Sequence, residues 1–280
     1  MNIQKAINQA SQILKKNEIK SFELDAEILM SHIIKKSREY IILNSNIELN
    51  NKDLKNYEYL IDKRKSKKPI AYLIGTKNFW KHKFNVTQDV LIPRPDTELI
   101  VEQVLNVSKF KSRLKILDIG IGSGCILLSI LSEKKDFYGT GIDISQKCLR
   151  VCKENSLKLN LENRLKLIKS DIDNFNYGKY DIIISNPPYI KNLDLKYLDK
   201  GVINFEPKQA LNGGVDGISE IRKTILKSSE LIKKRGKLVL EIACDQKDKV
   251  KRILTRNGFY INKVLKDLAK NDRCIVSTKI

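Results

Sequence analysis

The sequence predicts a small all-α bundle followed by a larger α/β domain, and two observations lead to this division. Near the N-terminus, apolar residues recur only at three- and four-residue spacings, as they do on one face of a helix. From about Thr97 onward, apolar runs of strand length alternate with helical segments, which is the pattern of an α/β fold. The length of 280 residues is sufficient for one large or two modest domains.

The N-terminal helices are predicted from periodicity. The first helix carries apolar residues at helical spacing from Ile3 to Leu14, and a second follows a predicted Ser21 cap. A third helix is predicted over residues 53–64. Because such a bundle buries little apolar surface by itself, we expect residues 1–75 to rest on the larger domain as an appendage.

The larger domain is predicted over residues 97–280, and residues 76–96 are expected to be a hairpin connector. Residues 191–217 are loop-rich, include two adjacent glycines, and are expected to cover a site. Seven strands are predicted, at residues 115–119, 138–143, 165–170, 180–185, 237–243, 260–265 and 273–279.

The most informative peptide is Ser-Asn-Pro-Pro-Tyr at residues 185–189, which follows an apolar run of strand character. Proline fixes φ and lacks an N–H group, so the carbonyl oxygens of this peptide have no local donor. An NH2 group is therefore able to donate one hydrogen to the Asn186 side-chain oxygen and the other to the Pro187 carbonyl, while the Tyr189 ring stacks on its face. A simple Pro-Pro turn is the alternative, but ligands bind at the carboxyl ends of strands in open α/β sheets.

A glycine loop follows an earlier strand, where residues 118–124 read Asp-Ile-Gly-Ile-Gly-Ser-Gly. Its spacing differs from the Gly-x-Gly-x-x-Gly of dinucleotide-binding proteins, and Asp118 lies two residues before the first glycine. A carboxylate here suits the ammonium group of a methionine moiety better than a pyrophosphate, which favours S-adenosylmethionine over NAD. Asp143 ends the next strand, where an acid is placed to accept hydrogen bonds from both ribose hydroxyls.

With these motifs, the chain resembles the release factor glutamine methyltransferases, the HemK/PrmC family of class I S-adenosylmethionine-dependent methyltransferases. The resemblance extends from about residue 69 to the C-terminus, and the first 68 residues agree only in helical character and length. Its discriminating piece is Pro-Arg-Pro-Asp-Thr-Glu at residues 93–98. Further shared segments are Pro-Ile-Ala-Tyr-Leu-Ile-Gly at residues 69–75, Phe-Trp at 79–80, Phe-Glu-Pro at 205–207 and Ala-Leu at 210–211.

The resemblance implies a Rossmann-like class I methyltransferase domain with a seven-stranded mixed sheet, closed by an antiparallel pair. It implies S-adenosyl-L-methionine as cofactor and methylation of the side-chain nitrogen N5 of the glutamine in the Gly-Gly-Gln motif of class 1 peptide chain release factors, the proteins of translation termination. The N-terminal bundle is then a substrate-docking domain. The implied setting is cytoplasmic, near the ribosome, without a stable nucleic-acid complex or a membrane partner.

The resemblance also implies roles for individual residues. Asn186, Pro187 and Tyr189 are catalytic, and Pro188 completes the substrate site. The residues assigned to the cofactor are Asp118, Gly120, Ile121, Gly122, Ser123, Gly124, Asp143, Asp171, Ile172 and Asn186. Because an amide nitrogen is a poor nucleophile, we expect positioning rather than a general base to provide most of the catalysis.

Several positions leave an alternative open or depart from the family pattern. Thr97 and Glu98 either line the same pocket or are only a helix cap and its first-turn acid. Ile121 stands where a small or hydroxylated residue is common, and Ile172 stands where many relatives have an aromatic residue. Residues 267–273 lack the glycine expected between an acid and an arginine, so the shape of that loop is expected to differ.

The chain is strongly basic, with 53 basic against 33 acidic residues and a net charge of +20. Such a charge is typical of nucleic-acid-binding proteins and supports two alternatives: an exocyclic-amine DNA or RNA methyltransferase acting on adenine N6 or guanine N2, and a non-catalytic RNA-binding module. Against both, lysine, isoleucine and asparagine are abundant together, as compositional bias produces, and arginines are a minority of the basic residues. The strongest basic run, at residues 63–68, is predicted to lie at the link between the domains.

Cysteine and histidine usage indicates neither a metal site nor a nucleophilic pair. The five cysteines show no Cys-x-x-Cys spacing, and the chain has two histidines. The thiols are interpreted as reduced core residues. Neither a long apolar stretch nor a signal-type N-terminus is recognisable, so a soluble, untargeted protein is expected.

Overall fold

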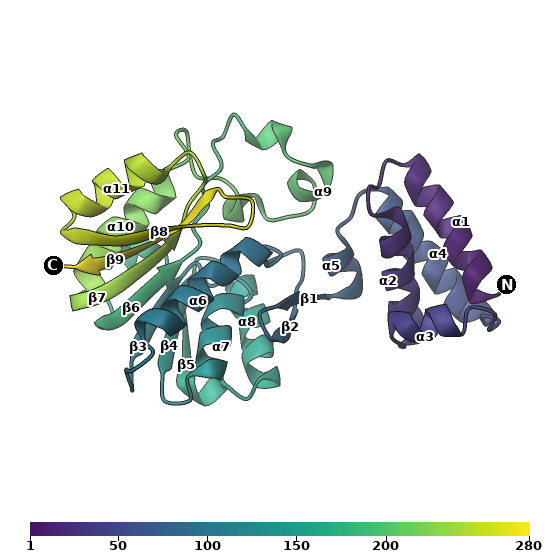
Figure 1. Ribbon diagram of the computed structural model, residues 1–280, viewed down its shortest axis with the longest axis horizontal. Coiled ribbons are helices and arrows are strands. Elements are labelled where there is room, and N and C mark those ends of the chain that lie inside the picture. Colours follow the sequence, from purple (N-terminus) through teal and green to yellow (C-terminus); the bar gives the residue numbers. More distant parts are fainter. The chain divides into compact units, whose positions relative to one another are not determined.

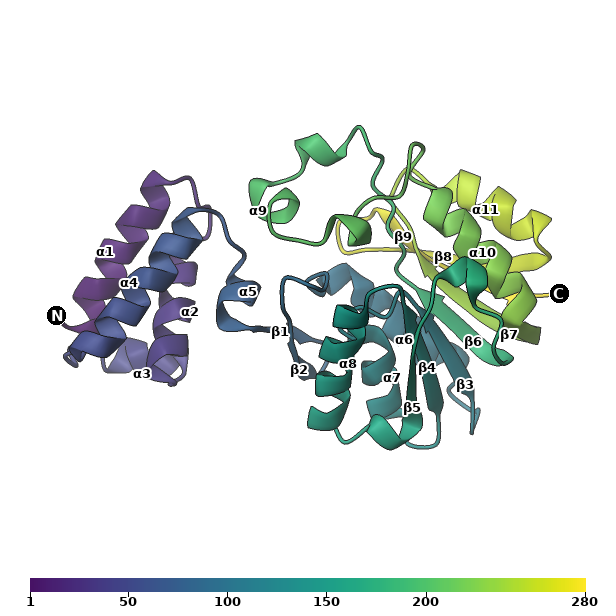
Figure 2. The same cartoon turned by 180° about the vertical axis from the view of Figure 1, so that it is seen from behind.

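The computed structural model describes all 280 residues and divides into two units. The first unit contains Met1–Thr76 and also Asp199–Phe205, a short segment from far along the chain. The second unit contains Lys77–Leu198 and Glu206–Ile280. Taken separately, the first unit is helical, and the second is a sheet covered by helices on both faces (Figures 1 and 2).

The helical unit forms around α1, α2 and α4, whose apolar faces bury Leu14, Leu29 and Tyr57. Asparagine or serine side chains cap α1, α3 and α4, whereas Ser21 precedes α2 without a capping hydrogen bond, contrary to the prediction. Periodicity did not predict α3 or α5, because so few residues carry no clear repeat. The helices are α1 (Ile3–Lys16), α2 (Phe22–Ile34), α3 (Arg38–Leu43), α4 (Asn51–Lys65), α5 (Ile70–Ile74) and α9 (Lys200–Ile203). The basic run at residues 63–68 begins in the last turn of α4, inside this unit and not at a link between the units.

The second unit contains a seven-stranded mixed sheet with the order β5-β4-β3-β6-β7-β9-β8, as expected. Neighbouring strands are parallel except around β9, which runs antiparallel to both β7 and β8. The strands are β3 (Lys115–Ile119), β4 (Tyr138–Asp143), β5 (Leu165–Lys169), β6 (Tyr180–Ser185), β7 (Ile232–Glu241), β8 (Phe259–Lys266) and β9 (Asp272–Lys279). Strand β7 begins before the predicted Lys237, because its pairing with β6 includes Ile232 across a stretch of basic residues that has no apolar pattern.

Helices cover both faces of this sheet and enclose two apolar cores (Figures 1 and 2). One core includes residues of α6 (Glu98–Val107), α7 (Cys125–Glu133) and α8 (Gln146–Lys158), together with Phe79 and Phe84 from the hairpin of β1 (Thr76–Phe79) and β2 (His82–Asn85). The other core lies under α10 (Ser219–Leu231) and α11 (Lys247–Arg256). Short 3-10 turns complete the unit: η1 (Pro95–Thr97), η2 (Glu162–Arg164), η3 (Ile172–Asn174), η4 (Leu195–Tyr197) and η5 (Lys208–Ala210).

The order of strands reverses at β3, and this reversal decides where a ligand is able to bind. From β3 the chain passes to β4 on one side and later returns to β6 on the other. The register pairs Asp118 with Gly141 of β4 and with Ile184 of β6. The carboxyl ends of these three strands therefore meet at a topological switch point, which is the usual ligand site of such sheets.

Candidate active site

A cavity of about 400 Å³ lies at the carboxyl ends of β3, β4 and β6. Its wall includes Gly120 and Gly122 after β3, Asp143 at the end of β4, and Asn186 after β6. Three motifs that are far apart in the sequence thus line one cavity. Four more of the predicted site residues belong to the wall: Asp171, Ile172, Pro187 and Pro188.

The glycine loop uses its residues for two different purposes. Gly120 and Gly122 face the cavity with φ values of 75° and 53°, in the left-handed region that glycine tolerates best. Gly124 also has a positive φ of 81°, and a Cβ atom there would lie 2.6 Å from the Cys152 sulfur. Gly124 is therefore needed for close packing of the loop against α8, and it is not part of the cavity wall.

Ile121 and Ser123 lie in the same loop but are buried away from the cavity wall. The Ile121 side chain fills the space above Gly141, where a Cβ atom would come within 2.1 Å of its Cδ1 atom. The large residue at position 121 therefore fits because Gly141, on β4, has no side chain. The Ser123 carbonyl accepts a hydrogen bond from the Asn155 side chain, so this residue also ties the loop to α8.

Asp118 is a buried carboxyl group without a hydrogen-bond partner. It is 1 % exposed, and neither side-chain oxygen has a donor within hydrogen-bond distance. Burial, and to a lesser extent the nearby Asp143 charge, raise the pKa of Asp118 to about 8. An unpaired buried acid is costly, and a cation at this position would relieve the cost.

Asp143 is held by backbone donors and keeps its carboxyl at the cavity. Its Oδ2 atom accepts a hydrogen bond from the Gly122 backbone N–H at 3.0 Å, and its Oδ1 atom accepts from that of Ser145 at 2.9 Å. Burial raises the pKa of Asp143 above its ordinary value, although these hydrogen bonds oppose the shift. Each oxygen retains a further lone pair, so the group is still able to accept from two hydroxyls.

Asn186 is oriented by Thr97. The Asn186 side-chain N–H donates to the Thr97 hydroxyl oxygen at 3.2 Å, which leaves the amide oxygen of Asn186 without a hydrogen bond. The adjacent Pro187 carbonyl also accepts no hydrogen bond. Two acceptors that belong to consecutive residues of the cavity wall are thus available to one NH2 group.

Thr97 and Glu98 were expected either to line the pocket or to be a helix cap and its first-turn acid, and neither alternative describes their contacts fully. Thr97 stands at the start of α6, but its side chain makes no capping hydrogen bond and instead accepts from Asn186. Glu98 accepts a hydrogen bond from the Trp80 backbone N–H at 2.8 Å and so ties α6 to the β-hairpin. Neither residue lines the cavity.

Tyr189 lies outside the cavity wall and packs against the core beneath α10 and α11. Its hydroxyl donates to the Glu241 Oε1 atom at 3.3 Å. Burial and the Glu241 charge raise the pKa of Tyr189 well above its ordinary value, so the ring stays neutral.

Two family motifs far apart in the sequence meet beside the cavity. Glu206, from Phe-Glu-Pro, is 5 % exposed and forms an ion pair with Arg94 from Pro-Arg-Pro-Asp-Thr-Glu. Its second oxygen accepts from the Ile92 backbone N–H at 3.2 Å. This pairing fixes the segment that follows, in which Pro207, Gln209 and Ala210 line the cavity. Only part of the loop expected to cover the site therefore reaches it.

Sequence reasoning missed several residues that surround the cavity, because each is an ordinary polar or apolar residue without a motif. The clearest are Leu91, Ile144, Cys148, Gln209 and Thr224 in the wall, and Glu241 behind Tyr189. Of these residues, Ile144 could have been predicted from the sequence, because it is an apolar residue that directly follows the acid at the end of β4. In the structure its side chain is 54 % exposed.

The cysteines are buried as expected, with one exception. Cys125, Cys148, Cys152 and Cys274 are buried, whereas Cys244 is exposed, so its interpretation as a core residue is wrong. Cys244 lies just after β7, where the chain leaves the sheet. No group of three or more His, Cys, Asp or Glu side chains is arranged to hold a metal ion. None of the helices combines the length and apolar character that a membrane span requires.

The cavity fits S-adenosylmethionine. Asp143 in the wall has acceptors for ribose hydroxyls, and the unpaired carboxyl of Asp118, which is buried and not among the residues of the wall, suits the ammonium group of the methionine part. Glycines at positive φ allow the loop backbone to approach the ligand closely. When bound, this cofactor supplies an electrophilic methyl group on a sulfonium.

Comparison with known proteins agrees with the fold. A family profile described as the PrmC N-terminal domain matches residues 5–75, and one described as the methyltransferase small domain matches residues 95–213. Among solved structures, a ribosomal protein L11 methylase from Lactobacillus delbrueckii subsp. bulgaricus has a TM-score of 0.50 at 17 % identity, covering 67 % of this chain and 81 % of that chain. At this identity the likeness shows the class I methyltransferase fold.

Full-length relatives show the family. A release factor glutamine methyltransferase of Clostridium botulinum is 38 % identical over 95 % of this chain and 95 % of its own length. Another, from Clostridium acetobutylicum, is 37 % identical over 100 % of this chain and 99 % of its own length. A bifunctional methyltransferase of Rickettsia felis is 33 % identical over 100 % of this chain, which corresponds to 58 % of that protein. The chain belongs to the release factor glutamine methyltransferase family, and its cofactor is S-adenosylmethionine.

Proposed function

We propose that this protein methylates the side-chain nitrogen N5 of the glutamine in the Gly-Gly-Gln motif of class 1 peptide chain release factors. The observation that carries the proposal is the pair of unused acceptors in the cavity wall, the Asn186 amide oxygen and the Pro187 carbonyl. A primary amide offers two N–H donors in one plane, which is what two such acceptors bind.

The proposed reaction depends on positioning. Hydrogen bonds from both amide hydrogens to Asn186 and Pro187 increase the electron density on the nitrogen and hold it in line with the methyl group. Holding reactants in an attack geometry contributes about 7–11 kcal/mol in favourable intramolecular models. The nitrogen forms a bond to the methyl carbon as the carbon–sulfur bond breaks, and the N-methylated amide then loses a proton to water.

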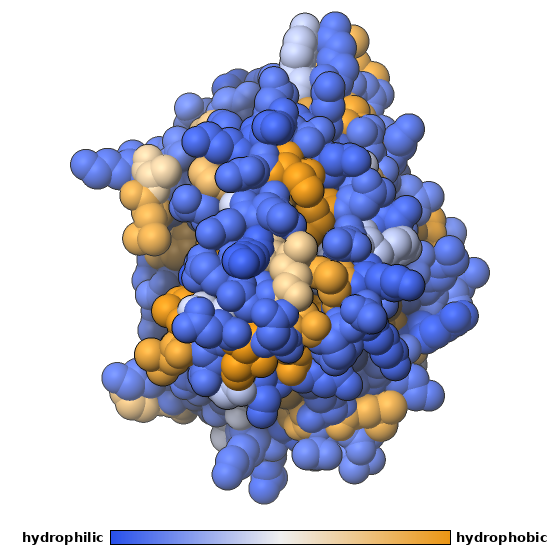
Figure 3. Space-filling model, turned by 90° about the vertical axis from the view of Figure 1, so that its right-hand side faces the viewer, coloured by the Kyte–Doolittle hydropathy of each residue, from blue (hydrophilic) through white to orange (hydrophobic).

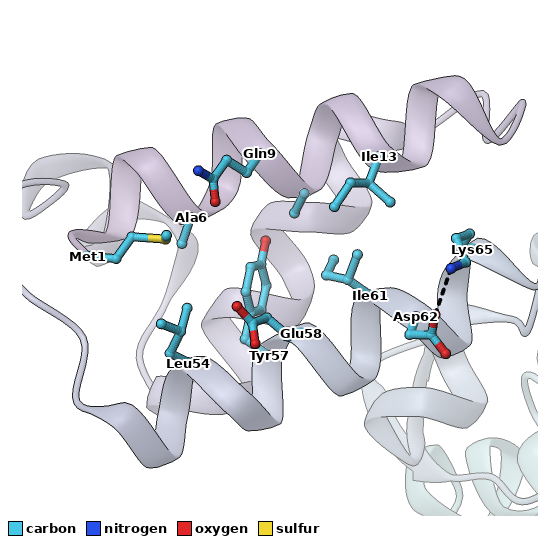
Figure 4. A pocket seen from close by; sticks show the side chains of 11 residues that line it. Met1, Ala6, Gln9, Ile13, Leu54, Tyr57, Glu58, Ile61, Asp62 and Lys65 are labelled. Atoms are coloured by element: carbon cyan, nitrogen blue, oxygen red, sulfur yellow. Dashed lines mark ion pairs between the residues drawn. The ribbon is translucent and has the colours of Figure 1, made fainter.

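We assign release-factor docking to the helical unit, because the unit lies outside every chemical motif and carries its own apolar groove. The groove has a volume of about 170 Å³ and lies between α1 and α4. Figure 4 shows Ala6 and Ile13 of α1 facing Leu54 and Tyr57 of α4 across it. The face of the molecule seen in Figure 3 carries separate apolar patches among polar side chains. A groove of this size suits a few apolar side chains of a protein partner.

The first experiment identifies the substrate. Purified release factors and, separately, DNA and RNA oligonucleotides are incubated with the enzyme and labelled S-adenosylmethionine, and the products are analysed by mass spectrometry. A single added methyl group on the Gly-Gly-Gln glutamine is expected, with no label in a release factor whose target glutamine is replaced by alanine. Label in adenine or guanine, and none in the release factors, would instead establish an exocyclic-amine methyltransferase.

The second experiment tests the docking groove with two matched variants of the helical unit. Ile13 lines the groove and is 42 % exposed, and Ile42 on α3 is 59 % exposed but lies outside it. We expect Ile13→Asp to raise the KM for an intact release factor about tenfold, as is typical when an interface contact is lost, and Ile42→Asp to leave it unchanged. Equal KM values for the two variants would exclude the groove as the docking site.

We further propose where in the cell the enzyme works. A soluble translation factor as substrate implies a cytoplasmic enzyme that works near the ribosome. The net charge of +20 would then favour encounter with acidic surfaces of that machinery without a stable nucleic-acid complex.

A further inference from the structure

The edge of the sheet opposite the cavity is strongly basic. Strands β3 to β7 are parallel, and β8 runs in their direction because β9 is antiparallel to both β7 and β8. The amino ends of these six strands therefore meet at one edge, which we call the amino edge and where the chain also ends (Figure 1). The exposed basic side chains of the segments that lead into or begin these strands are Lys109, Lys111, Arg113, Lys115, Lys135, Lys179, Lys233, Lys234 and Arg235.

Acidic side chains compensate little of this charge. Of the nine basic side chains, Lys233 is the only one in an ion pair, with the Asp181 Oδ1 atom at 2.7 Å. The other oxygen of Asp181 accepts from the Lys115 backbone N–H at 2.9 Å, and the Asp136 carboxyl accepts from the Arg113 backbone N–H at 2.7 Å. Because these acids hold the loop backbone, most of the basic side chains at the amino edge are left for a partner.

The cavity edge of the same sheet is different, because its basic side chains are paired. Lys147 forms an ion pair with Asp89 at 3.2 Å, and Lys223 forms one with Glu220 at 3.0 Å. Both of these acids belong to the cavity wall. A compositional bias toward lysine acts without regard to position in the fold. It does not explain why basic side chains are paired at one edge of the sheet and unpaired at the other.

Exposed aromatic side chains gather at the amino edge as well. The exposed aromatic residues of the second unit, apart from Tyr197, all lie there: Phe110, Tyr138, Tyr177 and Tyr260. Phe110 precedes β3 and is 93 % exposed. Tyr138 begins β4 directly beside Lys115 of β3, and the Lys166 Nζ atom lies 4.0 Å from the centroid of the Tyr177 ring. The amino edge thus combines unpaired positive charge with open aromatic rings.

We propose that the amino edge is a docking surface for single-stranded RNA, whose phosphates contact the basic side chains and whose bases stack on the aromatic rings. Proteins that bind single strands combine these same two features. An acidic protein would use the charge but not the rings, and a duplex would keep its bases stacked within the helix. Since the contacts are exposed, the binding is weak and sensitive to salt. It also leaves the cavity free, because the cavity lies at the other ends of the strands.

The first test measures binding of the full-length protein to a fluorescein-labelled, ten-nucleotide single-stranded RNA by fluorescence anisotropy at 50–200 mM salt. Saturable binding that weakens with salt is expected. Combining Lys111→Glu with Lys234→Glu should lower the affinity more than tenfold at 50 mM salt. The slope of log K against log salt should become shallower by about 1.4, because each phosphate contact to a single strand contributes about 0.7.

The matched control combines Lys249→Glu on α11 with Lys266→Glu at the opposite end of β8. Both lysines are exposed, and the two pairs of substitutions change the net charge equally. The control should keep the affinity within about threefold. Equal losses for the two pairs would show that net charge alone attracts the RNA and would overturn the proposal, as would absence of saturable binding by the natural protein.

The aromatic residues distinguish RNA from an acidic protein as the partner. Phe110→Ala and Tyr138→Ala should each lower the affinity for the RNA about fivefold or more, because a stacked base is lost, whereas Tyr197→Ala should have no effect. If both aromatic variants bind the RNA as tightly as the natural protein, the surface recognises charge alone and the proposal is wrong. Methylation of a release factor in free solution should be unchanged in every variant, so this proposal and the proposed function stand or fall separately.

Discussion

Two buried acids, Asp118 and Glu241, lie near the carboxyl ends of strands of the same sheet, and their surroundings differ. Asp118, at the end of β3, has no hydrogen-bond partner at all. Glu241, at the end of β7, accepts a hydrogen bond from the Tyr189 hydroxyl with one oxygen, and its other oxygen has no partner. Burial raises the pKa of both, to about 8 and about 7.

We relate this difference to the groups that are proposed to bind near each acid. We propose that the ammonium group of the cofactor pairs with Asp118, to which the protein supplies no hydrogen-bond donor. The neutral amide of the proposed substrate is assigned to Asn186 and Pro187, and Glu241 contacts the same peptide only through the Tyr189 hydroxyl. Both acids thus keep at least one buried oxygen without a partner, and Glu241 alone has a protein donor.

The largest expected effect comes from removing the substrate contact itself. Asn186→Ala should lower kcat by about 10² to 10³-fold, because a directed hydrogen bond to the reacting nitrogen is lost, while the cofactor Kd stays nearly unchanged. Turnover assays and calorimetric titration separate the two effects. Asn192→Ala, in the exposed loop just downstream, is the matched control and should be fully active. The amide-binding role is wrong if Asn186→Ala keeps more than about a tenth of the turnover.

A substitution at the proposed cofactor site should weaken cofactor binding more than it lowers turnover. Asp143→Ala is expected to raise the Kd for S-adenosylmethionine by about ten- to a hundredfold, since charge-assisted hydrogen bonds to hydroxyls contribute about 1.5–3 kcal/mol each before desolvation. At saturating cofactor, kcat should change much less. Equilibrium titration checks the first statement, and an unchanged Kd would remove Asp143 from the cofactor site.

The charge of Asp118 should make cofactor binding depend on pH. The free protein holds this carboxyl protonated below about pH 8, and binding of a cation requires the ionised form, so binding releases a proton. The affinity should therefore rise about tenfold per pH unit from pH 6 to pH 8, which is the limit for one proton released. Calorimetry in buffers of different ionisation enthalpy measures the proton directly. Affinity that stays constant over this range would show that Asp118 is already ionised.

The smallest expected effect is on stability. Because the folded state raises the pKa of Asp118, ionisation destabilises the fold between about pH 4 and pH 8, and the cost disappears below that window. Asp118→Asn should raise the free energy of unfolding of the cofactor-free protein at pH 7.5 by about 1 kcal/mol or more, with little difference at pH 4. Denaturant unfolding at both pH values measures this. Destabilisation at pH 7.5 would mean that the carboxylate has a stabilising partner.

Much of the fold was predictable because its signals are local. Each of the first four strands of the sheet is a short apolar run that ends at a glycine loop, an acid or a Pro-Pro peptide, and all four occur where predicted. The start of β7 was not predictable, because its basic residues pair with β6 only in the folded sheet. The short helix α3 and the missing Ser21 cap also depend on packing and not on propensity.

The turn before β9 is a second feature that the local sequence could not predict fully. The absence of a glycine between Asp267 and Arg273 predicted an altered loop, and the structure places Lys270 there with a positive φ of 66°. Asp267 accepts from the Asn271 backbone N–H at 2.9 Å and pairs with Arg273, so the turn closes without glycine. Local sequence shows that a glycine is absent, and only the surrounding contacts show what replaces it.

By itself, the sequence predicted the cofactor of this protein and the proposed substrate group, because the glycine loop, the acid that ends β4 and the Asn-Pro-Pro-Tyr peptide are each contiguous. The tertiary structure decided which of these residues reach the cavity, and it moved Ile121, Gly124 and Tyr189 into packing positions. It also placed Thr97 against Asn186 and Glu241 against Tyr189. Such contacts join residues far apart in the chain, and their register and burial are fixed only when the sheet assembles.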